Sequence, residues 1–519
     1  MKLRKIKLTP PIHAISVVLG VAFACSAAEY HVTDTVSFTN AMQNVGHNGT
    51  IYLAENIYDI SGVTNKSSTG SHYYDKRVHL RGEPGTRREK IVIKSGNKRH
   101  FGGNKSFVEL TGLTLEGPDS GFGGGIAYDN TDATGVALTN CIFRNMSSSG
   151  DYAVLSLNTR GSEYVTEPRF VHKCVFANNT AGRYYGVGRA PQTTFTDCIF
   201  TNNSSVSDYG VLMGGKLFKD CTFVDNRAGG RTAVFVYCYA GLESAVFDHC
   251  QFERNYAETG PAMFYWDLNN ARSLIVTNCT FRENSCKGRL LVTPGNSSDI
   301  RFVDTTFVGN VSTNELLFNG PGSFTRCTIS NNDCGGGSMM NYVTLADCLL
   351  VSNSAVRANN NSAFLASATV RNCTLVSNVL KGGSYRGILN AASVAVNTVF
   401  IDNEPNIYRN TGDPNGSKFL MTNCVWNVQS LTNATMTAWL AECSVNGRLV
   451  AEPKMKFSPE MPYLPLYGSP LRDKGYSDEA YRSAVGEKDL AGNARYMFKG
   501  IDVGCYECQK MPGLMLLVR

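Results

Sequence analysis

Four aromatic residues on two neighbouring copies of an internal repeat are the first candidates for chemistry. Phe235 and Tyr237 lie on one copy, and Phe264 and Trp266 occupy the matching places on the next. Strand alternation, counted from the apolar residue before each pair, predicts that all four side chains face outward. A row of exposed rings is unusual on a solvated surface and suits stacking against sugar rings. The pattern therefore predicts a carbohydrate-binding surface.

Two charged residues, Arg231 and Asp267, lie beside these aromatic residues in the sequence. A guanidinium group and a carboxylate can hydrogen-bond the hydroxyls or carboxylates of a sugar. Both repeat copies are long, at 29 residues from Cys221 to Cys250 and from Cys250 to Cys279, which leaves room for loops that wall a groove. The alternative is that such a loop simply covers the rings.

Hydrolysis of a polysaccharide would need carboxylates that position a water molecule and protonate the leaving oxygen. Polygalacturonases combine N-T-D, D-D and G-H-G motifs. This sequence has Asn130, Thr131 and Asp132 but neither of the other two motifs. The lone tripeptide is an ordinary feature of a glycine-rich loop, so it does not identify a hydrolase.

A polysaccharide lyase would need acidic residues that hold calcium, with a basic residue that abstracts a proton. Acidic residues precede the cysteine of several repeat copies: Asp197, Asp220, Asp304 and Asp347. Other copies have asparagine at the same place, for example Asn278 and Asn372. A feature that recurs on every copy is typical of a turn, so we expect no resident cofactor and leave calcium as the alternative. A catalytic histidine is excluded from the second half of the chain, because no histidine follows His249.

The repeat consists of a cysteine, an aromatic or aliphatic residue two places on, and an asparagine five places on, as in the stretch 221–226. The cysteine column contains Cys141, Cys174, Cys198, Cys221, Cys250, Cys279, Cys327, Cys348, Cys373 and Cys424, with Thr305 and Thr398 replacing cysteine in two copies. The asparagine column contains Asn179, Asn203, Asn226, Asn255, Asn284, Asn310, Asn332, Asn353, Asn378 and Asn403. A period of 21 to 29 residues between Cys174 and Thr398 predicts a solenoid.

Apolar residues two apart, with three such segments in each copy, predict three short strands per turn. Coils that stack about 4.8 Å apart bring equal residues into ladders. We therefore predict an all-β protein, a single right-handed parallel β-helix. Cysteine then serves as a small buried hydrophobe and is expected to be a free thiol, because parallel side chains suit a disulfide poorly. Asparagine is expected at a bend, bonded to the backbone and to its neighbours.

The formal charge of +6 owes much to the first ten residues, which carry Lys2, Arg4, Lys5 and Lys7 and no acid. The rest of the chain has 45 basic and 43 acidic side chains, or +2, which gives no reason to expect a nucleic-acid partner. The basic start, the apolar run 14–24 and the small residues before Glu29 predict a signal peptide over 1–28. Lipidation at Cys25 is the alternative. No later stretch is long and apolar enough to span a membrane.

The F-x-x-N stretches at 176–179, 200–203, 223–226, 252–255, 281–284, 307–310 and 400–403 resemble the repeat of chlamydial polymorphic outer membrane proteins. The G-G-A-[ILV] half of that repeat is degraded, and 123–127 and 260–264 are its closest matches. The resemblance covers about half of the chain. It implies an exported β-helical protein, often at the cell surface.

The segments 469–475, 489–495 and 500–509 are similar to the closing segment of bacterial choice-of-anchor Q proteins, which are secreted β-helices. The matching residues are Asp473, Asp489, Gly492, Arg495, Asp502, Gly504 and Glu507. Cys505 and Cys508 depart from that pattern. With no second pair at zinc spacing, a local disulfide is expected rather than half of a metal site.

These observations predict four regions: a signal peptide (1–28), an N-terminal cap with the first coils (29–115), the repeat body (116–427) and a C-terminal capping segment (428–519). A short amphipathic helix at 35–46 is expected to cover the first coil. We expect a monomeric protein that is secreted or held at the outer-membrane surface of a bacterium. Its expected function is non-catalytic binding of a polysaccharide or cell-surface glycan, and the alternative is a polysaccharide lyase or glycoside hydrolase on the same fold.

Overall fold

A computed structural model describes residues 28–509, with gaps at 64–70, 75, 104–106, 118, 121–124, 129–134, 158–168, 238–243, 261–262, 267–272, 292–298, 315–316, 357–362, 383–386, 391, 405–419, 427–449, 452–454, 479–480, 482–485 and 498. The signal-peptide and lipidation predictions concern residues 1–27, which lie outside the described residues. Asn130, Thr131 and Asp132 also lie outside them. In the described residues, no helix has the length and apolar character to cross a membrane.

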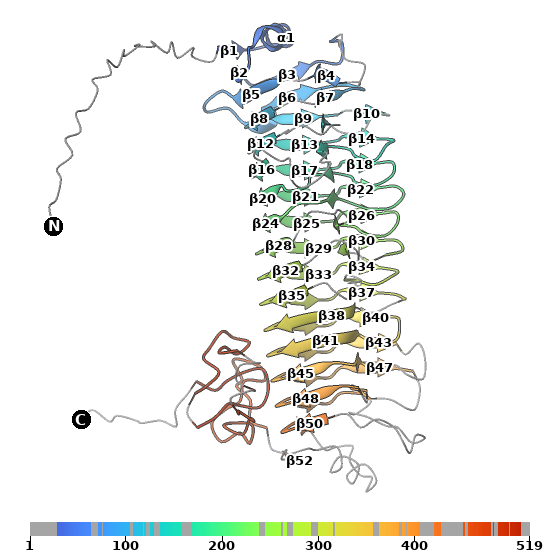
Figure 1. The fold of residues 1–519 in the computed structure, drawn as a ribbon, viewed down its shortest axis with the longest axis vertical. Coiled ribbons are helices and arrows are strands. Elements are labelled where there is room, and N and C mark those ends of the chain that lie inside the picture. The colour runs from blue at the N-terminus through green and yellow to red at the C-terminus, as the bar shows by residue number, and fades with distance from the viewer. Residues whose placement is uncertain are drawn as a thin grey trace, which may run out of the picture.

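The chain winds into a long parallel β-helix whose coils stack along one axis (Figure 1). Four parallel sheets, which we call A, B, C and D, form the stack. Sheets A and B run along its length, whereas sheet C extends from β4 to β31 and sheet D from β10 to β47. Each full coil passes through A, B, D and then C, as β12, β13, β14 and β15 do in turn. The predicted fold is confirmed, with one difference. The sequence indicated three strands per coil, whereas the structure adds a fourth strand of two or three residues in sheet D directly after the asparagine.

Sheet A has 17 strands: β1 (Glu29–Val32), β2 (Gly49–Leu53), β5 (Arg77–Gly82), β8 (Phe107–Thr111), β12 (Gly135–Thr139), β16 (Arg169–His172), β20 (Thr194–Thr196), β24 (Leu217–Lys219), β28 (Ser244–Asp248), β32 (Ser273–Thr277), β35 (Asp299–Val303), β38 (Phe318–Thr325), β41 (Met340–Ala346), β44 (Leu365–Ala366), β45 (Thr369–Arg371), β48 (Val394–Val396) and β50 (Leu420–Thr422). Sheet B has 16: β3 (Asn56–Asp59), β6 (Ile91–Lys94), β9 (Thr114–Glu116), β13 (Ile142–Arg144), β17 (Val175–Ala177), β21 (Ile199–Thr201), β25 (Thr222–Val224), β29 (Gln251–Glu253), β33 (Thr280–Arg282), β36 (Thr306–Val308), β39 (Thr328–Ser330), β42 (Leu349–Val351), β46 (Thr374–Val376), β49 (Val399–Ile401), β51 (Val425–Trp426) and β52 (Val450–Ala451).

Sheet D has 11 strands: β10 (Asp119–Ser120), β14 (Ser147–Ser148), β18 (Thr180–Ala181), β22 (Ser204–Ser205), β26 (Arg227–Ala228), β30 (Tyr256–Ala257), β34 (Ser285–Cys286), β37 (Val311–Ser312), β40 (Asp333–Cys334), β43 (Ser354–Val356) and β47 (Val379–Lys381). Sheet C has 8: β4 (Ser71–Tyr74), β7 (Arg99–Gly103), β11 (Ile126–Tyr128), β15 (Leu155–Leu157), β19 (Gly188–Arg189), β23 (Leu212–Met213), β27 (Phe235–Tyr237) and β31 (Phe264–Trp266). A 3-10 turn, η1 (Arg88–Lys90), precedes β6.

The core of the coils is built from ladders of equal side chains. The phenylalanine two places after the cysteine column stacks on its neighbours from Phe143 to Phe307, with ring centroids 4.5–5.1 Å apart. The cysteines of the column are buried beside it as free thiols, as predicted for Cys174, Cys198, Cys221, Cys250 and Cys279. Because the ladder spacing follows from the backbone hydrogen bonds, each residue needs to match only the coil above and the coil below.

The asparagine column forms a continuous hydrogen-bond ladder at the bend between sheets B and D. Asn255 is fully buried, and its Nδ2 donates to the carbonyl oxygen of Phe223 at 2.9 Å and to Oδ1 of Asn284 at 2.9 Å. Its own Oδ1 accepts from the backbone N–H of Asn226 at 3.1 Å. The same contacts recur along the column, for example between Asn179, Asn203 and Asn226. The predicted bonds to the backbone and to stacked neighbours are confirmed.

Two other positions in each coil have left-handed backbone dihedrals. One is the residue before the asparagine, as in Asn178 (φ +57°) and Asp225 (φ +56°). The other is the acidic or amide position before the cysteine, as in Asp197 (φ +55°) and Asp347 (φ +56°). Asparagine and aspartate tolerate this region better than most residues, which explains why they recur there. The acidic column is therefore a turn device, as the sequence indicated.

The burial of the cysteine column leads to a testable result. Burial raises the pKa of the Cys424 thiol to about 12, so the reactive thiolate is scarce at pH 8. We expect the column cysteines of the native protein to resist alkylation by iodoacetamide at pH 8 for hours, and to react within minutes in 6 M guanidinium chloride. Peptide mapping by mass spectrometry would check this. Rapid native labelling of Cys221 or Cys250 would contradict the burial.

The predicted N-terminal helix is confirmed as α1 (Thr35–Asn44), which lies over the first coils (Figure 1). The carboxylate of Asp34 caps it by accepting the backbone N–H of Ser37 at 2.7 Å. Its buried residue Phe38 packs against Tyr58 and Tyr73, with ring centroids 5.5 and 6.1 Å apart. The helix thereby covers apolar side chains that the first coil would otherwise expose.

We define the C-terminal segment as residues 455–509, which belong to the predicted capping segment 428–519. It lies beside the last described coils, against their flank, rather than across the end of the stack (Figure 1). The expected disulfide is also absent: Cys505 is a free buried thiol, so no bridge to Cys508 forms. Both cysteines are buried, and Cys505 packs against Leu349 of the coils. The segment therefore covers the side of the last described coils.

Candidate functional site

The aromatic row predicted from the sequence is only partly supported. Phe235 and Phe264 are fully buried, so they cannot contribute to an exposed surface. The ring of Phe235 packs against Phe247 and Phe218 at centroid distances of 5.3 and 5.5 Å. The prediction was wrong for these two residues because it assumed strict alternation after Val234, whereas Val234 and Phe235 are both buried. Two successive side chains point inward where the chain bends into sheet C, so alternation cannot be counted across that bend.

The other four residues of the predicted site do not lie together in the described part of the structure. Tyr237 and Trp266 are aligned in the register of β27 and β31, but their side chains lie outside the described part of the structure. Asp267 is also outside the described residues. Arg231 is exposed and borders a different aromatic cluster. That cluster is the candidate site described next.

Four tyrosines on three successive coils form what we call the tyrosine strip: Tyr152, Tyr184, Tyr185 and Tyr209. The rings of Tyr152, Tyr185 and Tyr209 are stacked nearly parallel, with centroids 5.8 and 5.6 Å apart and interplanar angles of 6° and 9°. Tyr184 lies against both Tyr185 and Tyr209 at 5.9 Å. Tyr185 is buried, whereas the other three are partly exposed. The strip is a second aromatic ladder, at the surface.

The strip is held by the segments that connect sheet D to sheet C. Tyr152 pairs with Tyr185, and Tyr209 pairs with Thr232, as parallel bridges. Backbone hydrogen bonds continue between coils, as from Gly186 N–H to the carbonyl oxygen of Gly210 at 2.7 Å. A Cβ on Gly210 would lie only 2.3 Å from the carbonyl oxygen of Ala233, so glycine permits this close approach. The tyrosines therefore have a fixed backbone beneath them.

Two arginine–aspartate pairs lie along the strip. Arg183 lies 3.5 Å from Asp151, its Nη2 donates to the Tyr184 hydroxyl at 3.2 Å, and its guanidinium stacks over that ring. Arg231 lies 3.7 Å from Asp208, and its Nη1 donates to the hydroxyl of Tyr209 at 3.4 Å. The arginine side chains are 60% and 53% exposed. The strip thus combines apolar ring surface with hydroxyl, guanidinium and carboxylate groups.

The sequence contains a signal for this strip. The tetrapeptides DYAV (151–154), YYGV (184–187) and DYGV (208–211) are one repeated motif. The same place in the following coils is occupied by RTAV (231–234) and GPAM (260–263), which ends the tyrosine run. Aligning the segment after the asparagine, as the cysteine segment was aligned, would have shown the three tyrosines in register.

The acidic column offers no comparable site. Asp304 makes two hydrogen bonds of 2.7 Å to Arg326, and Asp347 is paired with Arg495. Asp197 lies 3.4 Å from His172. Across the described residues, no group of three or more histidine, cysteine, aspartate or glutamate side chains is arranged to hold a metal ion. The acidic column therefore acts through its backbone conformation and local pairs.

Solved structures similar to this chain are parallel β-helices that act on polysaccharides. One is a mannuronic acid specific polysaccharide family 6 lyase from human gut microbiota, with 11% identity, a TM-score of 0.38, and coverage of 82% of this chain and 92% of the lyase. Another is the catalytic unit of a GH87 α-1,3-glucanase from Streptomyces thermodiastaticus, with 12% identity, a TM-score of 0.34, and coverage of 74% and 70%. No protein-family model and no curated protein sequence matches this chain. At this level, the likeness concerns the fold alone.

Proposed function

We propose that this chain is an exported, non-catalytic β-helix protein that binds a polysaccharide or cell-surface glycan along the tyrosine strip. The observation that carries the proposal is the run of four tyrosines over three coils, with Arg183 and Arg231 hydrogen-bonded to two of them. Tyrosine combines an apolar ring with a polar hydroxyl. The ring suits the C–H face of a sugar, and the hydroxyl can hydrogen-bond the hydroxyls of the sugar.

The geometry of the strip matches an extended polymer better than a compact ligand. Its stacked rings lie 5.8 and 5.6 Å apart, one ring to each coil, which is of the order of one sugar ring in an extended chain. A glycan lying parallel to the solenoid axis would therefore meet equivalent groups on each coil. Three of the four rings are partly exposed, so the ring edges are available for such contacts.

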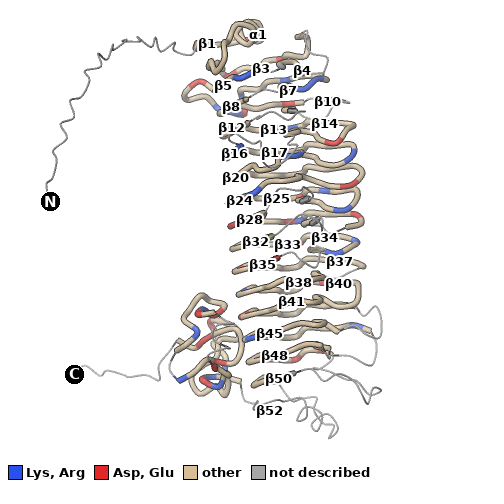
Figure 2. Tube along the Cα trace, in the orientation of Figure 1, with Lys and Arg blue, Asp and Glu red and all other residues tan. Residues whose placement is uncertain are grey.

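The charges on the strip favour recognition over catalysis. Each arginine has a carboxylate within 4 Å, which compensates the positive charge and keeps the guanidinium protonated, so neither arginine is available as a base. Basic and acidic residues are interspersed along the coils, with neither sign gathered on one side of this view (Figure 2). Long side chains with paired charges can hydrogen-bond hydroxyls on many sugars.

Retention on immobilised polysaccharides tests the proposal. We expect Tyr184→Ala to weaken binding to the retained polysaccharide by at least about tenfold, the size typical of an aromatic hot spot. Arg231→Gln should weaken it less, because its guanidinium is largely exposed. Affinity electrophoresis over a panel of acidic and neutral polysaccharides would measure both.

The matched control is Tyr342→Asn, on another coil. Tyr342 is 60% exposed, and asparagine is chosen because its φ is +57°. This variant should bind like the wild type. Loss of binding in Trp266→Ala but not in Tyr184→Ala would place the site on β31 instead. Release of unsaturated or reducing sugar ends, with or without calcium, would contradict the non-catalytic assignment and favour a lyase or hydrolase.

A further inference from the structure

The C-terminal segment is bound to the turn column of the coils by specific backbone contacts. The backbone N–H of Gly504 donates to the carbonyl oxygen of Asn397 at 2.9 Å, and that of Cys505 donates to Oγ1 of Thr374 at 3.1 Å. Further contacts join Tyr476 to Asn397, Tyr481 to Asn372 and the carbonyl of Lys474 to Asn423. The segment therefore spans several consecutive coils.

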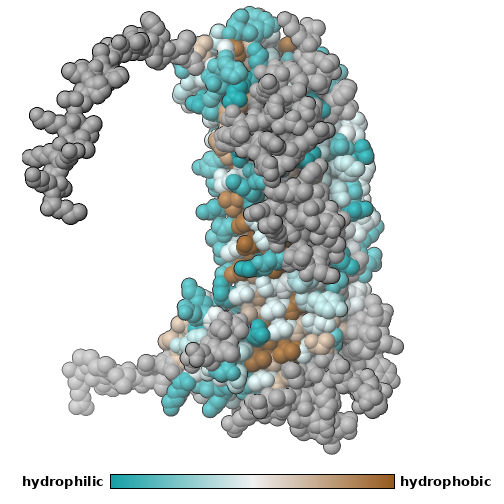
Figure 3. Space-filling model, in the orientation of Figure 1, coloured by the Kyte–Doolittle hydropathy of each residue, from teal (hydrophilic) through white to brown (hydrophobic). Residues whose placement is uncertain are grey.

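Apolar residues on the outer face of sheet B provide the rest of this interface. Leu349 packs with Cys505 and Tyr506. Val399 and Val425 pack with residues of the segment, namely Leu471 and Val503. Apolar surface is visible on the coils beside the segment in Figure 3. From Thr222 to Thr328 the same outward position is polar, as in Gln251 and Thr280, whereas the coils before them have Ile142, Val175 and Ile199 there. The change in residue type marks the docking surface.

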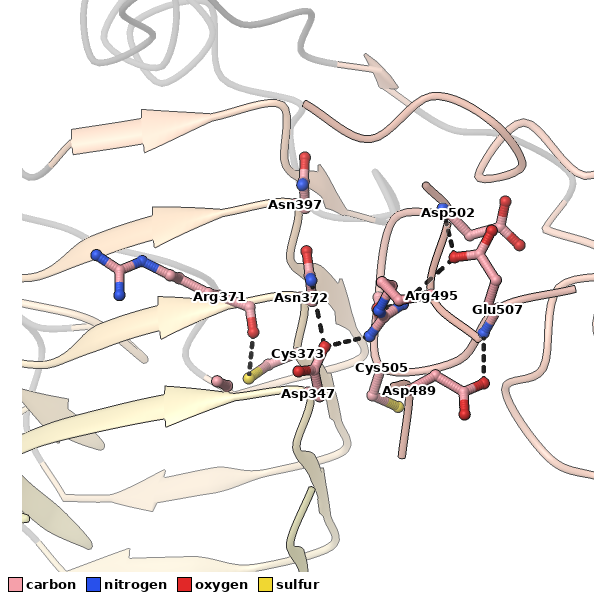
Figure 4. Close-up of polar contacts among 12 residues, drawn as sticks. Asp347, Arg371, Asn372, Cys373, Asn397, Asp489, Arg495, Asp502, Cys505 and Glu507 are labelled. Atoms are coloured by element: carbon pink, nitrogen blue, oxygen red, sulfur yellow. Dashed lines mark hydrogen bonds and ion pairs between the residues drawn. The ribbon is translucent and has the colours of Figure 1, made fainter. Parts of the chain in front are cut away.

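A cluster of charged residues is buried at the centre of the interface (Figure 4). Arg495 is fully buried, pairs with Asp347 of the coils, and lies 3.6 Å from Glu507 of its own segment. Glu507 accepts the backbone N–H of Asp502 at 3.0 Å, and its backbone N–H donates to Asp489 at 2.9 Å. All four carboxylates are at most 1% exposed.

The cluster has more carboxylates than cations. Arg495 supplies one positive charge against the four carboxyl groups, and it already pairs with Asp347. Oε1 of Glu507 and Oδ2 of Asp347 are buried with no hydrogen-bond partner among the described atoms. Burying several unpaired negative charges is costly, so the docked state requires bound protons. Undocking would give Asp347 and Glu507 access to water, where an ordinary carboxyl group is ionised at neutral pH.

We propose that the C-terminal segment is a pH-sensitive clasp, which holds the flank of the coils while its buried carboxyl cluster keeps a proton and detaches as that proton is lost. The charged groups that face Glu507 are Arg495, Asp473 and Asp502 of its own segment. Arg495 in turn faces Asp489 and, across the interface, Asp347 of the coils, and Arg472 lies 3.6 Å from Asp473. Cys505 and Tyr481 also border the cluster. Detachment would uncover Leu349, Val399 and Val425 without unwinding the coils.

The direction of the pH effect follows from the buried acids. Burial, followed by the charge of Asp502, raises the pKa of Glu507 to about 9. Burial likewise raises the pKa values of Asp347 and Asp502 to about 6. A raised pKa means that docking binds protons, so its stability is greatest below the ordinary glutamate pKa and falls as the pH rises towards 9. One bound proton changes the docking equilibrium by up to about tenfold per pH unit in that range.

Hydrogen exchange of the full chain, followed by mass spectrometry at pH 6 and pH 9 and corrected for intrinsic rates, tests the clasp. We expect protection of peptides covering 499–509 to fall at least about 100-fold between the two pH values. Peptides covering the ladder at 217–226 should keep their protection. In Glu507→Gln, which is neutral at both pH values, the fall at 499–509 should be less than about tenfold.

The matched control is Glu460→Gln, an exposed glutamate in the same segment, which should behave like the wild type. Equal protection of 499–509 at pH 6 and pH 9 in the wild type would overturn the proposal. The same fall in Glu507→Gln as in the wild type would show that Glu507 is not the responsible group. Loss of protection at 217–226 together with 499–509 would show unfolding of the whole solenoid rather than release of a clasp.

Discussion

Replacing Asn255 by aspartate is expected to lower the free energy of unfolding by about 3–5 kcal/mol, the cost of an uncompensated buried charge. The change keeps the shape of the side chain but replaces the Nδ2 donor with an acceptor. That atom would then face two acceptors, the carbonyl oxygen of Phe223 and Oδ1 of Asn284, which now lie 2.9 Å away. Urea unfolding followed by circular dichroism would measure the difference.

The control for this variant is Asn202→Asp, at the exposed position one residue before a column asparagine. Asn202 has a φ of +53°, and aspartate already occupies the equivalent place as Asp225. We expect a change within about 0.5 kcal/mol, as for most surface substitutions. Equal stability of Asn255→Asp and Asn202→Asp would mean that the buried ladder contributes little. Because coils contact only their neighbours, the loss should centre on the coils around Asn255.

Replacing Arg495 by methionine is expected to detach the C-terminal segment at neutral pH. Removing one partner from a buried ion pair costs about 3–5 kcal/mol, because the remaining charges are left uncompensated. Here Asp347 would lose its buried salt-bridge partner, and Glu507 would lose the guanidinium that lies 3.6 Å away. Hydrogen exchange should show the loss of protection at 499–509 at pH 7, while the ladder peptides stay protected.

Arg301→Met serves as the control, because Arg301 is an exposed arginine paired with Asp299. A surface ion pair contributes at most about 1 kcal/mol, so this variant should leave both the coils and the clasp protected. Full protection of 499–509 in Arg495→Met would show that apolar contacts alone hold the segment. At high pH, Arg495→Met should weaken docking and Glu507→Gln should strengthen it. The two variants therefore separate the loss of the ion pair from the loss of the titrating group.

The two ladders of the solenoid are stabilised by contacts between neighbouring coils, not by contacts with distant parts of the chain. Cys221, Phe223 and Asn226 each contact their equivalents one coil away. The tyrosine strip uses the same device at the surface, with Tyr185 between Tyr152 and Tyr209. A binding surface on such a fold is therefore built by repeating one residue type at one position of several coils.

The repeat body could be predicted because its signals are local. The spacing of cysteine, phenylalanine and asparagine recurs along the repeat body with few replacements, and stacked coils bring equal positions together. The N-terminal helix could be predicted for the same reason, since Asp34 and Ser37 are close in sequence and cap it. The sequence also indicated the turn role of Asp197 and Asp347, because asparagine replaces them in other copies.

The site was harder to predict because it depends on where a strand begins. Phe235 and Phe264 seemed to face outward by alternation, but Val234 and Phe235 are both buried at a bend. An offset of one residue at that bend exchanges the inner and outer faces of the segment. The tyrosine motif at 152, 185 and 209 is in register in the sequence, but the stacking and exposure of its rings depend on how the coils pack.

By itself, the sequence determined the parallel β-helix, its cysteine and asparagine ladders and the helix that covers its first coil, because these depend on contacts between neighbouring residues or equal positions of a repeat. Only the tertiary structure decided that the tyrosines form a stacked strip and that the C-terminal segment lies on the flank. Arg495 and Asp347 are separated by 148 residues, and no periodic pattern relates them. Their pairing depends on how two surfaces fit together and bury charge, and this is a property of the folded chain.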